Sequence, residues 1–176
     1  MEFFAVLPIR KNTEKMIVIN DTDHTKIGYV QRKYKSAFDE VLNHLPLSFR
    51  STTNIIGSTD EYSLKIKEQS FKSNLFKLKW DVYITSDSGE EVFLLEDRTK
   101  VSTNPRMLYH KSDKGYLFKR DSFNRTCYVY LKDSSSICAQ ITIEKLVPTH
   151  LKIVVENNNL SVIEILGIYY IMTLVY

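Results

Sequence analysis

The segment that most constrains the fold is Leu160–Tyr176, which reads LSVIEILGIYYIMTLVY. It is apolar on every face, with one acid near its start. A helix that is apolar all round must be buried, either in a large protein core or in a membrane. Ser161 and Glu164 have the S-x-x-E spacing of a capping box, and an acid suits the positive end of the helix dipole. The segment therefore predicts a buried helix that begins next to Ser161.

The interior of a β-barrel and a lipid bilayer are the two environments open to such a helix. The helix proper is about 15 residues long, or roughly 22 Å at about 1.5 Å per residue. A bilayer core is about 30 Å thick and needs about 20 apolar residues, and no cluster of Lys or Arg flanks the segment as in a membrane anchor. We therefore favour a barrel interior over a C-terminal tail anchor. The side chains expected to be buried there are Ile163, Ile165, Leu166, Ile168, Tyr169, Ile171, Met172 and Leu174.

Most of the chain before this helix alternates between apolar and polar residues in short runs bounded by turn residues. The clearest run is Phe76–Ile84, in which Leu78, Trp80 and Val82 share the apolar face. Such alternation is typical of a strand with one solvated face. Trp80 is expected to point inward, with its indole nitrogen hydrogen bonded. The other predicted strands are Phe3–Ile9, Lys15–Asn20, Lys26–Lys33, Tyr62–Ile66, Glu91–Glu96, Met107–His110, Lys114–Lys119, Thr126–Lys132, Ile137–Glu144 and Leu151–Val155.

Length and composition favour one domain spanning residues 1–176. A chain of 176 residues is long enough to bury a sizeable core, and no linker or internal repeat divides it. Aromatic residues make up 12% of the chain, which favours sheet. Many short strands with regular turns indicate a barrel or a sandwich.

One amphipathic helix is predicted between the strands, over Ser36–Leu45. Ala37, Phe38 and Val41 fall on one side at helical spacing, and Pro46 ends the helix. The helix either plugs one end of the barrel or touches a membrane surface. We favour the plug, because an apolar stripe usually faces a core.

Cys127 and Cys138 are expected to be free thiols. A hairpin turning at Ser134 and Ser135 places Cys127 opposite Thr142, roughly 13 Å along the strand from Cys138 at about 3.3 Å per residue. A disulfide needs Cα atoms closer than about 7 Å. Two free thiols, and a start whose apolar run is too short for a signal peptide, predict a cytoplasmic protein.

No pattern in the sequence predicts catalysis or a metal site. The histidines His24, His44, His110 and His150 are scattered and lack metal-ligand spacing with each other or with cysteine. Neither a nucleophile elbow nor a phosphate-binding glycine loop occurs. We therefore expect a protein that is not an enzyme and uses no metal and no cofactor.

The layout of the chain resembles the tubby C-terminal-like superfamily. The resemblance is carried by the KMIVIN…KIGYVQRKYK hairpin, the short helix after it and the closing IEILGIYYIMTLVY segment. That superfamily joins the tubby domain, the plant LURP-one-related proteins and the phospholipid scramblases. The resemblance implies a closed, mainly β, antiparallel barrel of about twelve strands around a central hydrophobic C-terminal helix. Tubby domains bind phosphoinositide headgroups through surface Lys and Arg, and scramblases are linked to lipid movement and calcium.

Cations crowd into the stretch from Arg98 to Arg125. They form a solubilising face, a patch for anionic lipid headgroups, or a surface for single-stranded nucleic acid. A net charge of only +3 makes nucleic acid the weakest of these, and we expect no nucleic-acid partner. The residues predicted to bind lipid, and expected to lie together on one rim of the barrel, are Arg106, Lys111, Lys114, Lys119 and Arg120.

The sequence thus predicts a non-enzymatic, monomeric binding module. Its expected partner is anionic phospholipid at the inner face of a membrane, contacted peripherally from the cytoplasm. The alternative is a structural or protein-interaction domain that binds an unknown protein and no lipid.

Overall fold

The computed structural model describes residues 1–8, 13–34, 54–70, 74, 77–121, 124–134, 136–157 and 159–176. Within these residues the chain forms a closed barrel of twelve antiparallel strands and a C-terminal helix, α2 (Val162–Val175). The predicted fold class is therefore confirmed. The predicted amphipathic helix Ser36–Leu45 lies outside the described residues.

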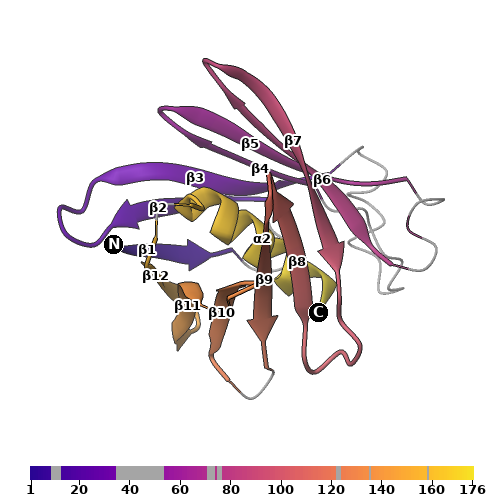
Figure 1. The fold of residues 1–176 in the computed structure, drawn as a ribbon. Coiled ribbons are helices and arrows are strands. Elements are labelled where there is room, and N and C mark those ends of the chain that lie inside the picture. The colour runs from indigo at the N-terminus through magenta and orange to yellow at the C-terminus, as the bar shows by residue number, and fades with distance from the viewer. Residues whose placement is uncertain are drawn as a thin grey trace.

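Each strand pairs with its neighbours along the chain, so the sheet is one continuous meander (Figure 1). The first and last strands close it, with Glu2 opposite Val154 and Leu7 opposite Thr149. Closure leaves the barrel without a free sheet edge. The strands are β1 (Glu2–Leu7), β2 (Lys15–Asn20), β3 (Lys26–Lys33), β4 (Asn54–Thr59), β5 (Tyr62–Glu68), β6 (Lys79–Ser86), β7 (Gly89–Asp97), β8 (Arg106–Lys111), β9 (Lys114–Arg120), β10 (Thr126–Leu131), β11 (Ile137–Leu146) and β12 (Thr149–Val155).

Alternate side chains of each strand point into the barrel. In β2, Met16 and Val18 are fully buried, while Lys15 and Ile19 on the opposite face are exposed. Trp80 on β6 is also buried, which confirms its predicted direction. Its indole nitrogen has no hydrogen-bond partner among the described residues, so that part of the prediction was wrong. The ring lies in the apolar core cluster, where polar partners are scarce.

Helix α2 is buried from Val162 to Met172 and contacts β3, β4 and β5. Figure 1 shows it running within the curve of the sheet. Its first turn also reaches β8 through Glu164, and Tyr176 after its last turn bonds Asp97 on β7. Contacts with both sides of the sheet are consistent with a helix at the centre of the barrel. Leu174, which we expected in the core, is only partly buried near the end of the helix.

A glycine lets α2 approach the sheet closely. A Cβ atom on Gly167 would lie 2.9 Å from Leu64 Cδ2 and 3.1 Å from Ile66 Cδ1. Real Cβ atoms are essentially never found closer than 3.0 Å to another heavy atom. The glycine that breaks the otherwise bulky helix sequence therefore marks the line along which the helix packs against β5.

Two details of the sheet differ from the prediction. Strand β4 was not predicted, and it lies between β3 and β5 with Ile55 and Gly57 buried. Cys127 lies opposite Ile141 rather than Thr142, because the register of β10 against β11 shifts at an irregularity between Val129 and Tyr130. Both cysteines are nevertheless free, as expected, and both are buried.

Candidate functional site

The predicted lipid-binding cations all lie on the β8–β9 hairpin, but the hairpin separates them. Lys111 and Lys114 face each other beside the turn, whereas Arg106 faces Lys119 at the other end, next to Arg120. Five residues of strand separate Lys114 from Lys119, or roughly 17 Å at about 3.3 Å per residue. The expectation that the five cations share one rim was therefore wrong.

Lys111 takes part in holding the helix in place. Its ammonium lies 2.9 Å from a carboxylate oxygen of Glu164 and 3.3 Å from the carbonyl oxygen of Asn159. Glu164 is only 2% exposed, and its other carboxylate oxygen accepts a 2.9 Å bond from the Tyr109 hydroxyl. The charge of Lys111 is thus matched by a buried acid. It is not free for an external anion.

Glu164 also completes the predicted capping box. It accepts a bond from the backbone nitrogen of Ser161 at 3.0 Å, and the Ser161 hydroxyl accepts one from the Glu164 nitrogen at 3.3 Å. The S-x-x-E spacing identified this local pair. It carried no information about Tyr109 and Lys111, which lie 55 and 53 residues away along the chain. The one sequence signal that relates Tyr109 to Lys111 is the alternation of side chains along β8, which places Met107, Tyr109 and Lys111 on the same face of the strand.

The three cations at the other end of the hairpin differ in how they are held. Arg106 donates to the carbonyl oxygens of Pro105 and Arg120, each at 3.1 Å, and pairs with Asp121 at 3.0 Å. The Lys119 ammonium lies 5.0 Å from the centre of the Tyr130 ring. Burial raises the pKa of Tyr169 to about 12, and the positive charge of Arg120 opposes part of that rise. Arg120 therefore lies near Tyr169, in the second half of α2.

Charge is unevenly distributed along the barrel axis. At the end where α2 begins, the described residues of the hairpin turns are 21–25, 60–61, 87–88, 112–113, and 132–134 with 136, and each of these turns contains an Asp. We call this the acidic end. Its turn acids are Asp21, Asp23, Asp60, Glu61, Asp87, Asp113 and Asp133.

The opposite end of the barrel is mainly basic in the described part of the chain, and we call it the basic end. Arg106, Lys119 and Arg120 lie there, and Lys111 and Lys114 do not. The acids described at this end include Glu14, Glu68, Asp97 and Asp121. The further cations of its connections and strand ends are Lys15, Lys33, Lys77, Lys79, Arg98, Lys100, Arg125 and Lys145.

One acid near the basic end is fully engaged by neighbouring cations. Glu96 pairs with Arg98 at 2.5 Å and with Lys79 at 3.5 Å, and His110 lies 3.7 Å away. Burial alone would raise the pKa of Glu96, but the hydrogen bond and charge of Arg98, with Lys79 and His110, hold it below its usual value. The carboxylate therefore stays charged and neutralises part of the surrounding positive charge.

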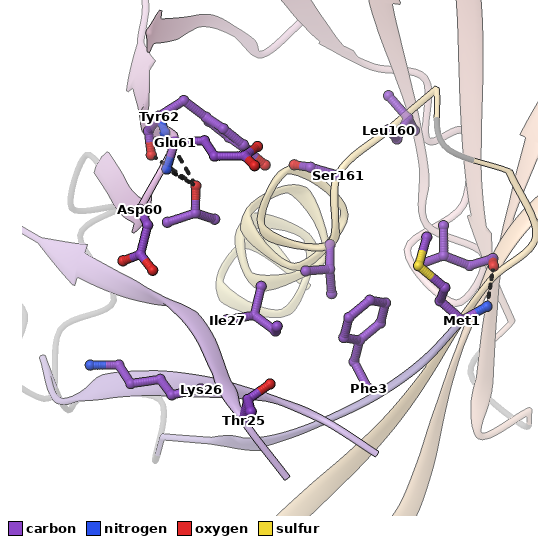
Figure 2. Close-up of a pocket in the computed structure, with 13 residues that line it drawn as sticks. Met1, Phe3, Thr25, Lys26, Ile27, Asp60, Glu61, Tyr62, Leu160 and Ser161 are labelled. Atoms are coloured by element: carbon purple, nitrogen blue, oxygen red, sulfur yellow. Dashed lines mark hydrogen bonds between the residues drawn. The ribbon is translucent and has the colours of Figure 1, made fainter. Parts of the chain in front are cut away.

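A cavity of about 530 Å³ opens at the acidic end, beside the first turn of α2. Figure 2 shows Phe3 and Ile27 directed toward the helix, with Ser161 at its start. Lys26, Asp60 and Glu61 line the cavity as well, so one cationic side chain lies with two acidic ones. The volume is typical of a small-molecule site, but the balance of charge does not favour an anionic headgroup there.

Tyr62, which also lines this cavity, is unusual. Burial raises the pKa of Tyr62 to about 12, the nearby Ser161 hydroxyl opposes the rise, and the charges of Glu164 and Glu61 add to it. The phenol oxygen is enclosed, and no hydrogen-bond partner of ordinary geometry is found for it in the described residues. It is therefore a neutral group at physiological pH and no base.

A second hollow, of about 440 Å³, lies on the outer wall. Phe4, Val6, Ile17 and Ile19 of β1 and β2 supply its apolar lining, and His150 is among the polar residues. The core is already filled by the inward-facing side chains of β1 and β2. The outward-facing apolar side chains that line the hollow are therefore not part of that core.

The described residues contain no group of His, Cys, Asp and Glu that could hold a metal ion. Burial raises the pKa of the Cys127 thiol to about 12, so this thiol is not activated as a nucleophile. Among the described helices, none has the length and apolar content needed to cross a membrane.

Comparison with known proteins gives one match. The family model of the Tubby C-terminal like domain matches residues 3–176. No curated protein and no solved structure matches the chain.

Proposed function

We propose that this chain, which belongs to the tubby C-terminal-like domain family, is a non-enzymatic module that binds anionic phospholipid headgroups through the basic end of its barrel. Domains of this family are of the binding type. The observation that carries the proposal is the separation of charge along the barrel axis. In a protein with a net charge of only +3, most of the cations described in connections and at strand ends lie at the end opposite the acidic turns.

The two ends are far enough apart to act independently. Strand β9 spans seven residues, or roughly 23 Å at about 3.3 Å per residue. The Debye length is only about 8 Å at physiological salt, so the acids of one end do not cancel the field of the other. Each Lys or Arg near an anionic bilayer contributes about 1 kcal/mol. The basic end would therefore face the membrane, with the acidic end directed away from it.

The proposed contact residues follow from this orientation. Lys119, Arg120 and Arg106 remain from the sequence-based site, joined by Lys100 and Arg125 in the adjoining connections. Lys111 and Lys114 are left out, because they lie at the acidic end and Lys111 is paired with Glu164. We place the protein in the cytoplasm, bound peripherally at the inner membrane face as a monomer.

Co-sedimentation with vesicles tests the proposal. Wild type should sediment with phosphatidylcholine vesicles containing about 30% phosphatidylserine, and not with phosphatidylcholine alone. Retention should fall as salt rises to about 1 M, where the Debye length is about 3 Å. The variant Lys100→Glu/Lys119→Glu should lose retention. Lys100 is exposed and Lys119 half-buried, and neither forms an ion pair in the part of the chain that the structure describes.

The matched control is Lys26→Glu/Lys114→Glu, which makes the same change in net charge at the acidic end. Both lysines are exposed. This control should sediment nearly as well as wild type, and all three proteins should unfold at similar temperatures. Equal losses in both variants would show that net charge alone governs binding. No retention of wild type at low salt would leave the alternative, a structural or protein-interaction domain without a lipid ligand.

A further inference from the structure

The turn between β11 and β12 is unlike the other described turns of the barrel. It consists of Val147 and Pro148 and follows Leu146, the last residue of β11, with Leu146 56% and Val147 83% exposed. Turns normally carry Gly, Asn, Asp, Ser or Pro, and the five at the acidic end all contain Asp. A run of consecutive exposed apolar residues is unfavourable in water unless it has a function.

This turn lies at the basic end, level with Leu7 at the end of β1 and beyond the start of β10. The nitrogen of Ile143 donates to the carbonyl oxygen of Arg125, so β10 begins level with Ile143. Leu146 lies three residues further, roughly 10 Å beyond that level at about 3.3 Å per residue. Lys145, opposite His150, stands directly behind the tip. In the connection between β7 and β8, Val101 is also exposed, at 57%, next to Lys100.

We propose that the segment Leu146–Pro148, hereafter the apolar tip, inserts into the interfacial layer of the anionic bilayer that the basic end contacts. This inference rests on the proposed lipid association and adds a second, hydrophobic contribution to it. An apolar tip with cations directly behind it matches the layering of a membrane surface, where acyl chains lie below charged headgroups. The apolar lining of the adjoining wall hollow, which includes Val6 next to His150, continues this surface.

A protein partner fits the tip less well. A stable protein interface buries about 800 Å² on each side, and two projecting side chains at a hairpin turn supply only a small part of that. The same two side chains suffice to strengthen a weak electrostatic attachment. Burial of a Val or Leu side chain removes apolar surface from water, which is favourable in proportion to the area buried. Since interfacial burial is partial, the pair should strengthen vesicle binding about ten-fold or more.

A fluorescent label at the tip tests insertion directly. Val147→Cys can be labelled selectively with an environment-sensitive dye, because Cys127 and Cys138 are 1% and 2% exposed. The control is Ser88→Cys, in the polar β6–β7 turn at the acidic end. Adding vesicles with about 30% phosphatidylserine should shift the emission of the label at position 147 to the blue and shield it from iodide. The label at position 88 should not respond.

Removing the apolar groups tests their contribution to affinity. Leu146→Ser/Val147→Ser should bind the same vesicles about ten-fold or more weakly than wild type, with the salt dependence retained. The matched control is Val92→Ser/Ile137→Ser, which removes two other apolar side chains, 54% and 39% exposed, one from β7 and one from the start of β11, at the other end of that strand from the tip. This control should bind like wild type.

The outcomes separate the two proposals. If wild type does not bind anionic vesicles at low salt, the proposed function fails and insertion fails with it. If wild type binds while the label at position 147 is unchanged and Leu146→Ser/Val147→Ser binds equally well, insertion is overturned and the electrostatic attachment stands. A blue shift without vesicles, accompanied by a dimer on size-exclusion chromatography, would instead make the tip a contact between copies of the chain.

Discussion

The Tyr109 hydroxyl donates a 2.9 Å hydrogen bond to the buried carboxylate of Glu164, which ties the first turn of α2 to β8. The same carboxylate accepts from Lys111 and from the backbone nitrogen of Ser161. A single acid therefore caps the helix and joins it to the wall of the barrel. Because a carboxylate has room for several donors, this arrangement satisfies a charge that would otherwise be costly to bury.

Removing the cation from this cluster should destabilise the fold. Lys111→Met leaves Glu164 charged and buried without its ion-pair partner. Breaking a fully buried pair costs about 3–5 kcal/mol, and because the Lys111 side chain is 24% exposed we expect a loss of about 2–3 kcal/mol in the free energy of unfolding. Urea denaturation measures this loss. Lys114→Met, across the same turn, is the control and should stay within about 0.5 kcal/mol of wild type. Equal stability of the two variants would show that the ion pair is not needed.

Deleting residues 160–176 should abolish folding. The deletion removes the residues that fill the barrel, of which Ile163, Ile165 and Leu166 are fully buried. Each contributes about 1.5–3 kcal/mol on burial, which exceeds a typical net stability when summed over the helix. The truncated chain should aggregate and show no cooperative thermal transition. A soluble truncated protein that unfolds cooperatively would show that the barrel does not depend on α2.

The fluorescence of Trp80 should report the native core. It is the one tryptophan of the chain and is 1% exposed. Its emission should be blue-shifted in the folded protein and move to the red on denaturation, because water then reaches the indole. An emission maximum typical of exposed tryptophan in the folded state would mean that β6 has the opposite face in the core.

Alkaline pH should destabilise the protein. Burial raises the pKa of Cys127, Tyr62, Tyr169 and Tyr170 to about 12 in the folded state. In the unfolded chain these groups ionise near pH 9 for the thiol and pH 10 for the phenols. Below about pH 9 they are neutral in both states. As the pH rises from there toward 12, only the unfolded state loses the protons, so unfolding becomes easier.

Urea denaturation at pH 7, 9 and 10.5 measures this effect. The free energy of unfolding should be similar at the first two values and clearly lower at the third. A free energy that stays constant up to pH 10.5 would show that these groups ionise as readily in the folded protein as in the unfolded one.

The elements that the sequence predicted best are those whose signals are local. Strands β2 and β3 have the predicted bounds, and α2 is capped by Ser161 as its S-x-x-E spacing indicates. Strand β4 gave no such signal, because NIIGST contains adjacent isoleucines followed by a glycine. Glycine suits that position, since a Cβ atom on Gly57 would lie 3.0 Å from the carbonyl oxygen of Tyr29, closer than most Cβ contacts.

The candidate site was harder to predict, because it depends on which ends of distant strands meet. The density of cations between Arg98 and Arg125 was visible, but their division between two ends of the barrel follows from strand direction. The pairing of Lys111 with Glu164 joins residues 53 positions apart, which no local pattern encodes. Leu146 and Val147 did leave a signal that we did not use, namely an apolar run where a polar turn was due.

The pairing of β1 with β12 has a consequence for synthesis of the chain. Val154 must leave the ribosome before Glu2 can find its partner, and the residues of α2 emerge later still. Until then the nascent chain is an open sheet with two unpaired edges and an unfilled interior. Contacts so distant along the chain form slowly, and open edges invite pairing with other molecules. Folding of the barrel would therefore be completed only after α2 has left the ribosome, and the newly made domain would depend on chaperones more than a helical domain of similar size.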